Sequence, residues 1–112
     1  MERLPDVELL TLLAVARMGD GAYGVGILDE IRASSGKEVS IAAVYAALER
    51  LERQGLVRAG LSDPIPERGG RARRHFRVTA SGRSRLRLER AAAMRVWRLK
   101  PIDSLEDDPK AW

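Results

Sequence analysis

The chain has 112 residues, of which 45% are apolar and 32% are charged, so it is long enough for one modest domain with an aliphatic core. It has no cysteine and only one histidine, which excludes a disulfide scaffold, a thiolate zinc site and a cysteine nucleophile, and no stretch approaches the roughly 18 apolar residues of a membrane span. The net charge of +4 conceals a basic block over residues 68–100, where twelve basic side chains accompany one acidic side chain; such a block points first to nucleic acid, the alternative being solvated arginines on helix faces.

The first predicted helix runs from Asp6, its expected N-cap, to about Met18. Its apolar residues cover nearly every face, so we expect one side to pack on its own domain and another side to pack on a partner subunit. A glycine-containing turn over residues 19–24 follows, and a second helix is predicted from about Val25 to Ser34.

A third helix is predicted after Ser40, a strong N-cap candidate, because apolar residues recur at spacings of three and four from Ile41 to Leu51. Gly55 is expected to end this helix in a Schellman motif, in which Leu56 contacts Leu51. The second and third helices are joined by a short break, so together they indicate a helix-turn-helix.

Two strands are predicted after the third helix, over residues 57–61 and 74–79, because apolar and polar residues alternate there. Residues 62–70 contain two prolines and two glycines and are expected to be irregular. The two strands therefore form a β-hairpin with a long basic tip, and Phe76 on its inner face is expected in the core.

The last predicted helix is capped by Thr79 or Ser81 and reaches about Lys100, where Pro101 ends it. The element order predicts a mainly α fold with a small β-hairpin wing: a winged helix-turn-helix followed by one long C-terminal helix. We expect the DNA-binding domain at residues 1–80, with the wing at about 57–79, the dimerisation helix at 81–100, and a flexible acidic tail at 101–112.

Three segments of the chain carry a family resemblance. Residues 22–25 read Ala-Tyr-Gly-Val, residues 40–57 contain Val-Tyr-x-Ala-Leu-x-Arg-Leu and Gly-Leu-Val, and residues 69–82 contain Gly-Gly-Arg-Ala-Arg-Arg-His-Phe-x-Val-Thr. In this order and spacing they resemble the PadR family of bacterial transcriptional regulators, over about residues 5–100. The chain departs from that pattern where family members often carry Pro-Gly-Ser/Thr and this chain has Ile-Ala-Ala at residues 41–43, and where they carry Pro and it has Ala46.

The resemblance implies a winged-helix homodimer that represses transcription. It places the third helix in the major groove, the wing along the backbone or the minor groove, and the C-terminal helix in the dimer interface. The chain is short, like the family branch that has a single C-terminal helix and no separate effector domain.

The recognition surface is predicted on the first turns of the third helix. Small residues allow close approach to the groove floor, alanine methyls can contact the thymine methyl, and the Tyr45 hydroxyl can contact phosphate. The alternative is an ordinary helix whose alanines serve helix propensity. Arg50 lies later on the helix and either contacts phosphate or pairs with a nearby glutamate. The candidate DNA-binding residues here are Ser40, Ala42, Ala43, Tyr45, Ala46 and Arg50.

Arginines crowd the glycine-containing tip of the predicted wing. Arginine inserts well into a narrow minor groove, and the glycines let the backbone approach a duplex. The alternative is a solvated loop tip. The candidate DNA-binding residues of the turn and wing are Tyr23, Lys37, Arg68, Arg71, Arg73 and Arg74.

The dimer interface is predicted where the first helix meets the last. Its candidate residues are Leu9, Leu13, Leu88, Ala92, Val96, Trp97 and Leu99. Trp97 either packs between the two copies or holds a small planar effector, and a further alternative is control by protein abundance without any ligand.

These patterns predict a sequence-specific DNA-binding transcriptional regulator, a repressor that binds an inverted-repeat operator in double-stranded DNA as a homodimer. The alternatives are a winged-helix module that binds protein and a nonspecific nucleic-acid binder. No arrangement of side chains predicts catalysis, a cofactor or a metal site, so we do not expect an enzyme. The N-terminus lacks the pattern of a signal peptide, and we expect a cytoplasmic protein without a membrane partner.

Overall fold

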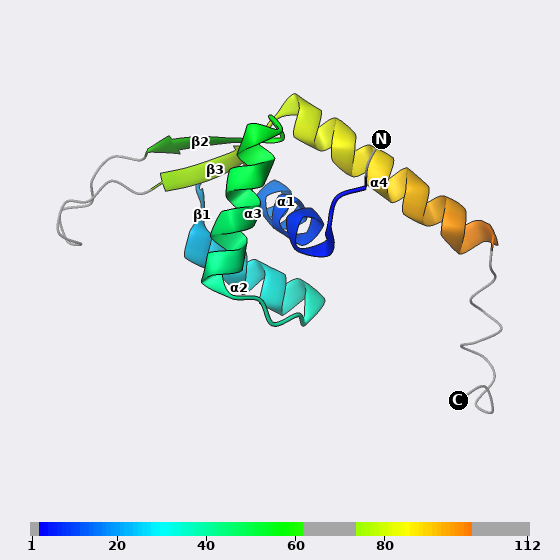
Figure 1. Ribbon diagram of the computed structural model, residues 1–112, viewed down its shortest axis with the longest axis horizontal. Helices are drawn as coiled ribbons and strands as arrows, with labels where there is room; N and C mark the ends of the chain where they lie inside the picture. Colours follow the sequence, from blue (N-terminus) through cyan, green and yellow to red (C-terminus); the bar gives the residue numbers. More distant parts are fainter. Residues whose placement is uncertain (1–2, 62–73, 100–112) are drawn as a thin grey trace.

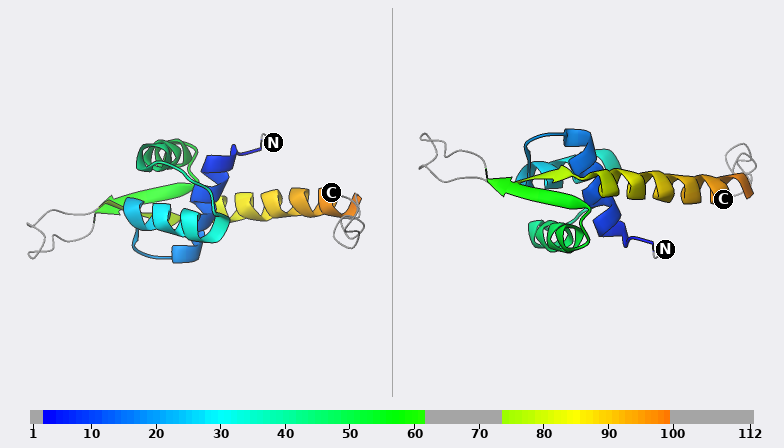
Figure 2. Two further views of the ribbon diagram at one scale, coloured as in Figure 1. Left: turned by 90° about the horizontal axis from the view of Figure 1, so that it is seen from below. Right: turned by 90° about the horizontal axis from the view of Figure 1, so that it is seen from above.

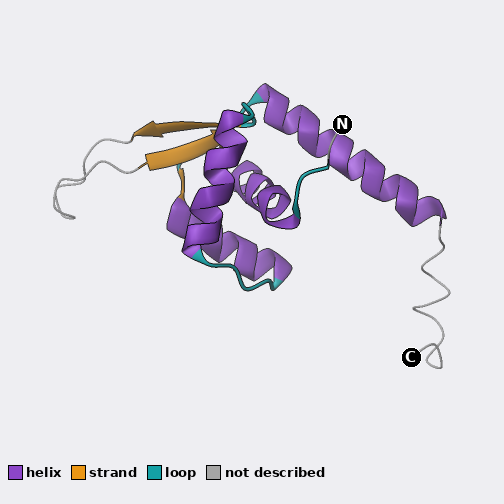
Figure 3. Ribbon diagram, in the orientation of Figure 1, coloured by secondary structure: helices purple, strands orange, loops and turns teal. Residues whose placement is uncertain are grey.

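The structure is a computed structural model that describes residues 3–61 and 74–99 (Figure 1). Four helices and three short strands follow one another as α1 (Asp6–Met18), β1 (Ala22–Tyr23), α2 (Gly24–Ser35), α3 (Ile41–Arg53), β2 (Val57–Leu61), β3 (Arg74–Val78) and α4 (Ala80–Leu99). Helices predominate and the strands gather at one end (Figure 3), which confirms the predicted mainly α fold with a small wing. None of the helices in these two ranges combines the length and apolar character needed to cross a membrane.

The sheet has three antiparallel strands in the order β1-β3-β2, so the prediction of a two-stranded hairpin was incomplete. β1 lies inside the segment predicted as a plain turn over residues 19–24, and Tyr23 is the register partner of His75 in β3. A strand of two residues is too short to show alternation, and it forms because the other edge of β3 offers unpaired backbone groups. The hairpin of β2 and β3 itself is confirmed.

The start of α1 differs from the prediction. Pro5 occupies the N-cap position and its carbonyl accepts the Leu9 N–H at 2.9 Å, so Asp6 is the first helical residue and the prediction of Asp6 as N-cap was wrong. Proline fixes its φ at −58°, which suits the entry to a helix. The Asp6 carboxylate lies 3.2 Å from Lys37 Nζ instead, still in the first turn where the helix dipole favours negative charge.

Both predicted ends of α3 are confirmed. The Ala43 N–H donates to Ser40 Oγ at 3.1 Å, which is the expected N-cap bond. At the other end, Leu56 N–H donates to the Leu51 carbonyl at 2.9 Å and Gly55 N–H to the Glu52 carbonyl at 3.0 Å, the two bonds of a Schellman motif. Gly55 has φ of +74°, a backbone conformation that glycine adopts without steric cost.

The core lies between α1, α2, α3 and the inner face of the sheet. Phe76 is almost fully buried there, as predicted from its place in the alternating strand. The largest fully buried side chains around it are aliphatic and include Leu12, Ile27, Ile31, Leu48 and Leu51. A core of this kind holds α3 in a fixed position relative to the sheet.

α4 begins at a joint with the end of α3. Thr79 Oγ1 accepts the Gly82 N–H at 3.0 Å, which confirms Thr79 as the cap, and donates to the Gly55 carbonyl at 2.7 Å. From this joint α4 runs past α1 and away from the sheet (Figure 2). The predicted end of the helix at Lys100 and Pro101, and the predicted acidic tail at 101–112, lie outside the described residues.

Candidate nucleic-acid interface

The outer face of α3 carries small side chains around one large aromatic side chain. Ala42 is exposed and Tyr45 is 47% exposed, whereas Ala43 and Ala46 are half-buried. The Ser40 hydroxyl is engaged in capping the helix. Among the candidates on the first turns of α3, Ala42 and Tyr45 therefore present exposed side chains, whereas Ala43 and Ala46 are partly covered.

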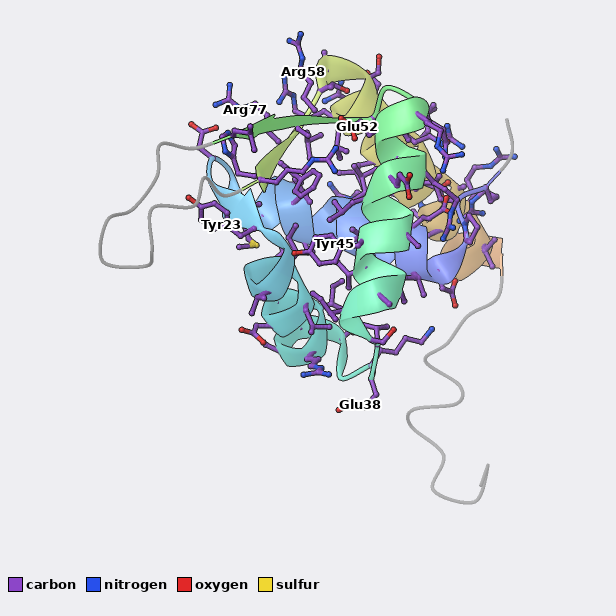
Figure 4. The ribbon with its side chains drawn as sticks, turned by 60° about the vertical axis from the view of Figure 1, so that its left-hand side comes forward. Tyr23, Glu38, Tyr45, Glu52, Arg58 and Arg77 are labelled. Atoms are coloured by element: carbon purple, nitrogen blue, oxygen red, sulfur yellow. The ribbon has the colours of Figure 1, made fainter. Side chains whose placement is uncertain are left out.

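Tyr45 lies across the start of α2. A Cβ atom added at Gly24 would collide with the Tyr45 ring, so the ring packs directly on the Gly24 backbone. The ring borders a hollow of about 620 Å³ that Tyr23 and Arg74 also line. Figure 4 shows Tyr23 and Tyr45 on this side of the molecule. The structure thus brings together three candidates that the sequence placed on a turn, a helix and a strand.

Arg74 connects the wing to α3. Its guanidinium lies 2.6 Å from a Glu52 carboxylate oxygen and 5.3 Å from the centroid of the Phe76 ring. Both contacts orient a long side chain that is still about half exposed. Arg74 can therefore face a polyanion at the hollow, from a position that α3 and the core define.

Arg50 forms an ion pair with Glu8 of α1, one of the two interpretations that the sequence left open. Glu8 is 4% exposed, so its carboxylate depends on this partner for compensation of its charge. The Arg50 side chain is about half exposed and remains at the surface of α3. Sequence reasoning did not identify Glu8 as the partner, since 42 residues separate the two.

Of the remaining residues predicted to contact DNA, the structure describes only Lys37. Lys37, in the loop between α2 and α3, pairs with Asp6 at 3.2 Å on an exposed surface. Arg68, Arg71 and Arg73 lie outside the described residues.

An apolar groove of about 430 Å³ runs between α1 and α4. Leu9 and Leu13, both predicted interface residues, line it together with Leu86 and Ala93 of α4. Leu13 is 40% exposed although it is a large aliphatic side chain. The groove lies where the first and last helices were predicted to meet, but Leu86 and Ala93 were not among the predicted interface residues.

Three predicted interface residues of α4, Leu88, Ala92 and Val96, do not line this groove. Leu88 is 52% exposed and Val96 is 64% exposed, while Ala92 is half-buried. Met94, which the sequence analysis did not single out, is also exposed. The side chains of Trp97 and Leu99 lie outside the described residues.

Glu89 is the one acidic residue of the basic block at residues 68–100. The sequence analysis did not predict that it would be buried and bonded to the N-terminal segment. It is 4% exposed and accepts hydrogen bonds from Arg3 Nε at 2.7 Å and from the Leu4 N–H at 3.1 Å. Burial alone would raise the pKa of this carboxyl, but those bonds and the charges of Arg3 and Arg85 outweigh it and leave the pKa lowered. A single acidic residue among twelve basic ones was the feature of the sequence that could have indicated a buried ion pair.

Comparisons with known proteins identify a family and similar folds for this chain. The pattern of the family described as "Transcriptional regulator PadR-like family" matches residues 12–88, more than half of the chain. No curated protein matches the sequence.

Three solved structures illustrate the similarity of the fold. A PadR-like transcription factor from Bacteroides fragilis has a TM-score of 0.71 at 19% identity, with 84% of this chain and 85% of that one covered. A PadR-like transcriptional regulator from Bacillus cereus has a TM-score of 0.70 at 18% identity, with 91% and 92% covered. A PadR family transcription regulator from Clostridium difficile has a TM-score of 0.65 at 20% identity, with 92% and 96% covered.

Proposed function

This chain belongs to the PadR-like family of transcriptional regulators, and we propose that it is a repressor that binds an inverted-repeat operator as a homodimer. The family is one of DNA-binding regulators and not of enzymes. The observation that carries the proposal is the hollow beside α3, where Tyr23, Tyr45 and Arg74 meet on one surface. Because its target is the chromosome, we place the protein in the cytoplasm.

We propose that residues 1–80 form the DNA-binding domain and that α3 enters the major groove. Ala42 and Tyr45 are exposed on its outer face, and small side chains there permit close approach to base edges. Tyr45 then contacts phosphate or a base from its seat on Gly24. Arg68, Arg71 and Arg73 of the wing tip contact the DNA backbone or the minor groove.

The proposed homodimer rests on apolar surface that the single chain leaves uncovered. An apolar groove separates α1 from α4, the helix that runs away from the sheet. Leu88 and Val96 of α4 are also exposed. Large exposed aliphatic side chains of this kind mark an interaction surface. A twofold dimer through α4 (proposed dimerisation helix, 81–100) would place two copies of α3 about one duplex turn, roughly 34 Å, apart.

The operator can be found by sequencing the genomic fragments that the protein selects, followed by titration of the selected duplex and a shuffled duplex. We expect the selected duplex to bind far more tightly and to contain an inverted repeat. Equal affinity for both would support a nonspecific nucleic-acid binder instead, and absence of any DNA binding would support a module that binds protein. Protection of a single asymmetric half-site would contradict the homodimer.

Tyr45→Phe tests the recognition surface because it keeps the ring on Gly24 and removes only the hydroxyl. If the hydroxyl contacts DNA, we expect a loss of affinity of about fivefold or more, and Tyr45→Ala should lose more on the operator than on random DNA. Equal losses on both duplexes with Tyr45→Ala would make Tyr45 a positioning residue without a part in sequence selection.

The wing can be tested through the salt dependence of binding. Arg71→Ala and Arg73→Ala should each flatten the log–log salt slope by about 0.9 if each arginine neutralises one phosphate. Arg95→Ala on α4 is the matched control, and its slope should equal that of the unaltered protein. An unchanged slope in the double wing variant would remove the wing from the interface.

We propose that release of DNA is controlled at the dimer seam. A flat apolar effector that stacks near Trp97 would favour one angle between the two copies of α4 and so one spacing of the recognition helices. The alternative is control by protein abundance. Trp97 fluorescence in a Trp112→Phe background should respond to a planar aromatic ligand in the first case and to no member of a ligand panel in the second.

A further inference from the structure

A second polar pocket, of about 450 Å³, lies where the end of α1, the β2–β3 hairpin and the first turn of α4 meet. Three arginines from three elements line it: Arg58 of β2, Arg77 of β3 and Arg83 of α4. We call it the arginine pocket. Figure 4 shows Arg58 and Arg77 extending from the sheet on the side away from Tyr45, so the pocket is separate from the hollow beside α3.

Two of these arginines face each other across the sheet, and the repulsion between them lowers the stability of the fold unless anions compensate their charge. Arg58 and Arg77 are direct register partners across β2 and β3, and like charges directly opposite each other destabilise a sheet. Their neighbours Val57 and Phe76 are buried, so both arginines are fixed on the outer face by the alternation of the strands.

The charge of the arginine pocket is only partly compensated. Arg77 pairs with Asp20 at 3.0 Å, and Asp20 is the single carboxylate among the residues that line the pocket. Within residues 3–61 and 74–99, the side chains of Arg58 and Arg83 have neither an ion-pair nor a hydrogen-bond partner. Three guanidinium groups against one carboxylate leave an excess of two positive charges.

This excess matches one chemical group well. A phosphate monoester carries a charge of about −1.5 to −2 at pH 7 and offers several oxygens, and guanidinium groups bind such oxygens in pairs. Ala16 and Val78 also line the pocket and provide apolar contact for an organic substituent. The volume lies within the range of roughly 300–1,000 Å³ that is usual for small-molecule sites.

We propose that the arginine pocket binds a small phosphorylated organic molecule, of the class of mononucleotides and sugar phosphates. Arg58 and Arg77 belong to the wing strands and Arg83 belongs to α4, so the ligand would bridge the wing and the helix that carries the exposed Leu88 and Val96. A ligand that prefers one arrangement of these two elements shifts the protein toward it. The arginine pocket shares no lining residue with the hollow beside α3, so its ligand is independent of the proposed DNA-binding role.

The test is calorimetric titration of the full chain with AMP, glucose 6-phosphate, adenosine and inorganic phosphate. We expect saturable binding of at least one of the two organic phosphates, tighter than that of inorganic phosphate, and no binding of adenosine. In Arg58→Gln/Arg83→Gln the affinity should fall about tenfold or more, the loss expected when a charge-assisted hydrogen bond disappears. Arg95→Gln removes one positive charge from α4 outside the pocket and should bind like the unaltered protein.

Asp20→Asn provides a test of the opposite sign. It removes the carboxylate that competes for Arg77, so the affinity for the organic phosphate should rise. No saturable binding by either organic phosphate, equal binding by inorganic phosphate, or equal weakening by Arg95→Gln would each overturn the proposal.

A titration with a DNA duplex separates the two surfaces. We expect Arg58→Gln/Arg83→Gln to change duplex affinity no more than Arg95→Gln does. A loss for the duplex as large as the loss for the organic phosphate would assign the pocket to the DNA interface and overturn the proposal. Thermal unfolding by circular dichroism checks the fold, and the melting temperature of the double variant should be unchanged or higher because it removes one of two opposed cations.

Discussion

Glu89 is the best place to test how α4 is held to the rest of the chain. Its buried carboxylate accepts hydrogen bonds from Arg3 and from the Leu4 N–H, and Arg85 Nε lies 3.8 Å away. Glu89→Gln keeps the shape of the side chain but removes its charge. We therefore expect the free energy of unfolding to fall.

The size of the loss follows from these contacts. A hydrogen bond to a charged group contributes about 1.5–3 kcal/mol, whereas a neutral one contributes about 1 kcal/mol. Gln retains one carbonyl oxygen, which can still accept one of the two bonds. Arg3 is about half exposed, so water weakens its share. We expect a loss of roughly 2–3 kcal/mol, a large part of the 5–15 kcal/mol by which domains of this size are usually stable.

The effect should depend on pH in one direction. The pKa of Glu89 in the folded chain lies below its ordinary value of 4.5, so the carboxylate stabilises the fold while it is ionised. This contribution is fully present above the unfolded-state value and is lost as the pH falls through the lowered folded-state pKa. The difference between the unaltered protein and Glu89→Gln should therefore be greatest near pH 7 and should shrink below about pH 4.5.

The assay is urea unfolding followed by far-UV circular dichroism, at one protein concentration because dimerisation would make stability depend on it. Glu38→Gln is the matched control: Glu38 is highly exposed and lies 3.8 Å from Arg32, so the change should cost less than about 0.5 kcal/mol. If Glu89→Gln costs no more than Glu38→Gln at pH 7, the proposed role of the buried carboxylate is wrong.

Three further substitutions test other contacts. Gly24→Ala places a methyl group against the Tyr45 ring and should cost about 1–3 kcal/mol in urea unfolding, and the cost should largely disappear in a Tyr45→Ala background. Arg50→Ala leaves the buried Glu8 carboxylate without its partner and should cost roughly 2–4 kcal/mol, with partial recovery when Glu8→Gln is added; full stability of the single variant would contradict the ion pair. Val96→Glu puts a charge into the proposed dimer seam and should give a monomer in sedimentation equilibrium, whereas an intact dimer would place the seam elsewhere.

Local signals explain why most of the fold was predictable. Ser40 and Gly55 mark the two ends of α3 through bonds that reach only a few residues along the chain. The alternating pattern that predicts β2 and β3 is likewise contained within each strand. β1 was missed because two residues carry no periodicity, and its existence depends on the edge of β3, more than 50 residues later.

Some contacts of the candidate site could not be predicted from the sequence, because they join residues that are far apart along the chain. The ion pair of Glu8 with Arg50 spans 42 residues, and the bond of Arg3 to Glu89 spans 86. Both depend on how α1 packs against its neighbours, which no spacing along the sequence reports. The packing of Tyr45 on Gly24 is of the same kind, since it needs the crossing of α2 and α3 to bring a ring onto a residue without a side chain.

The joint at Thr79 connects the end of α3 to the start of α4. Its hydroxyl bonds both to the carbonyl of Gly55 at the end of α3 and to the Gly82 N–H at the start of α4, and its own N–H donates to the Leu56 carbonyl at 3.1 Å. A Cβ at Gly82 would collide with that Leu56 carbonyl, so α4 begins in direct contact with the chain that leaves α3. These contacts fix the start of α4 relative to the end of α3. A ligand or partner that displaced α4 would therefore strain this joint directly, without touching the outer face of α3.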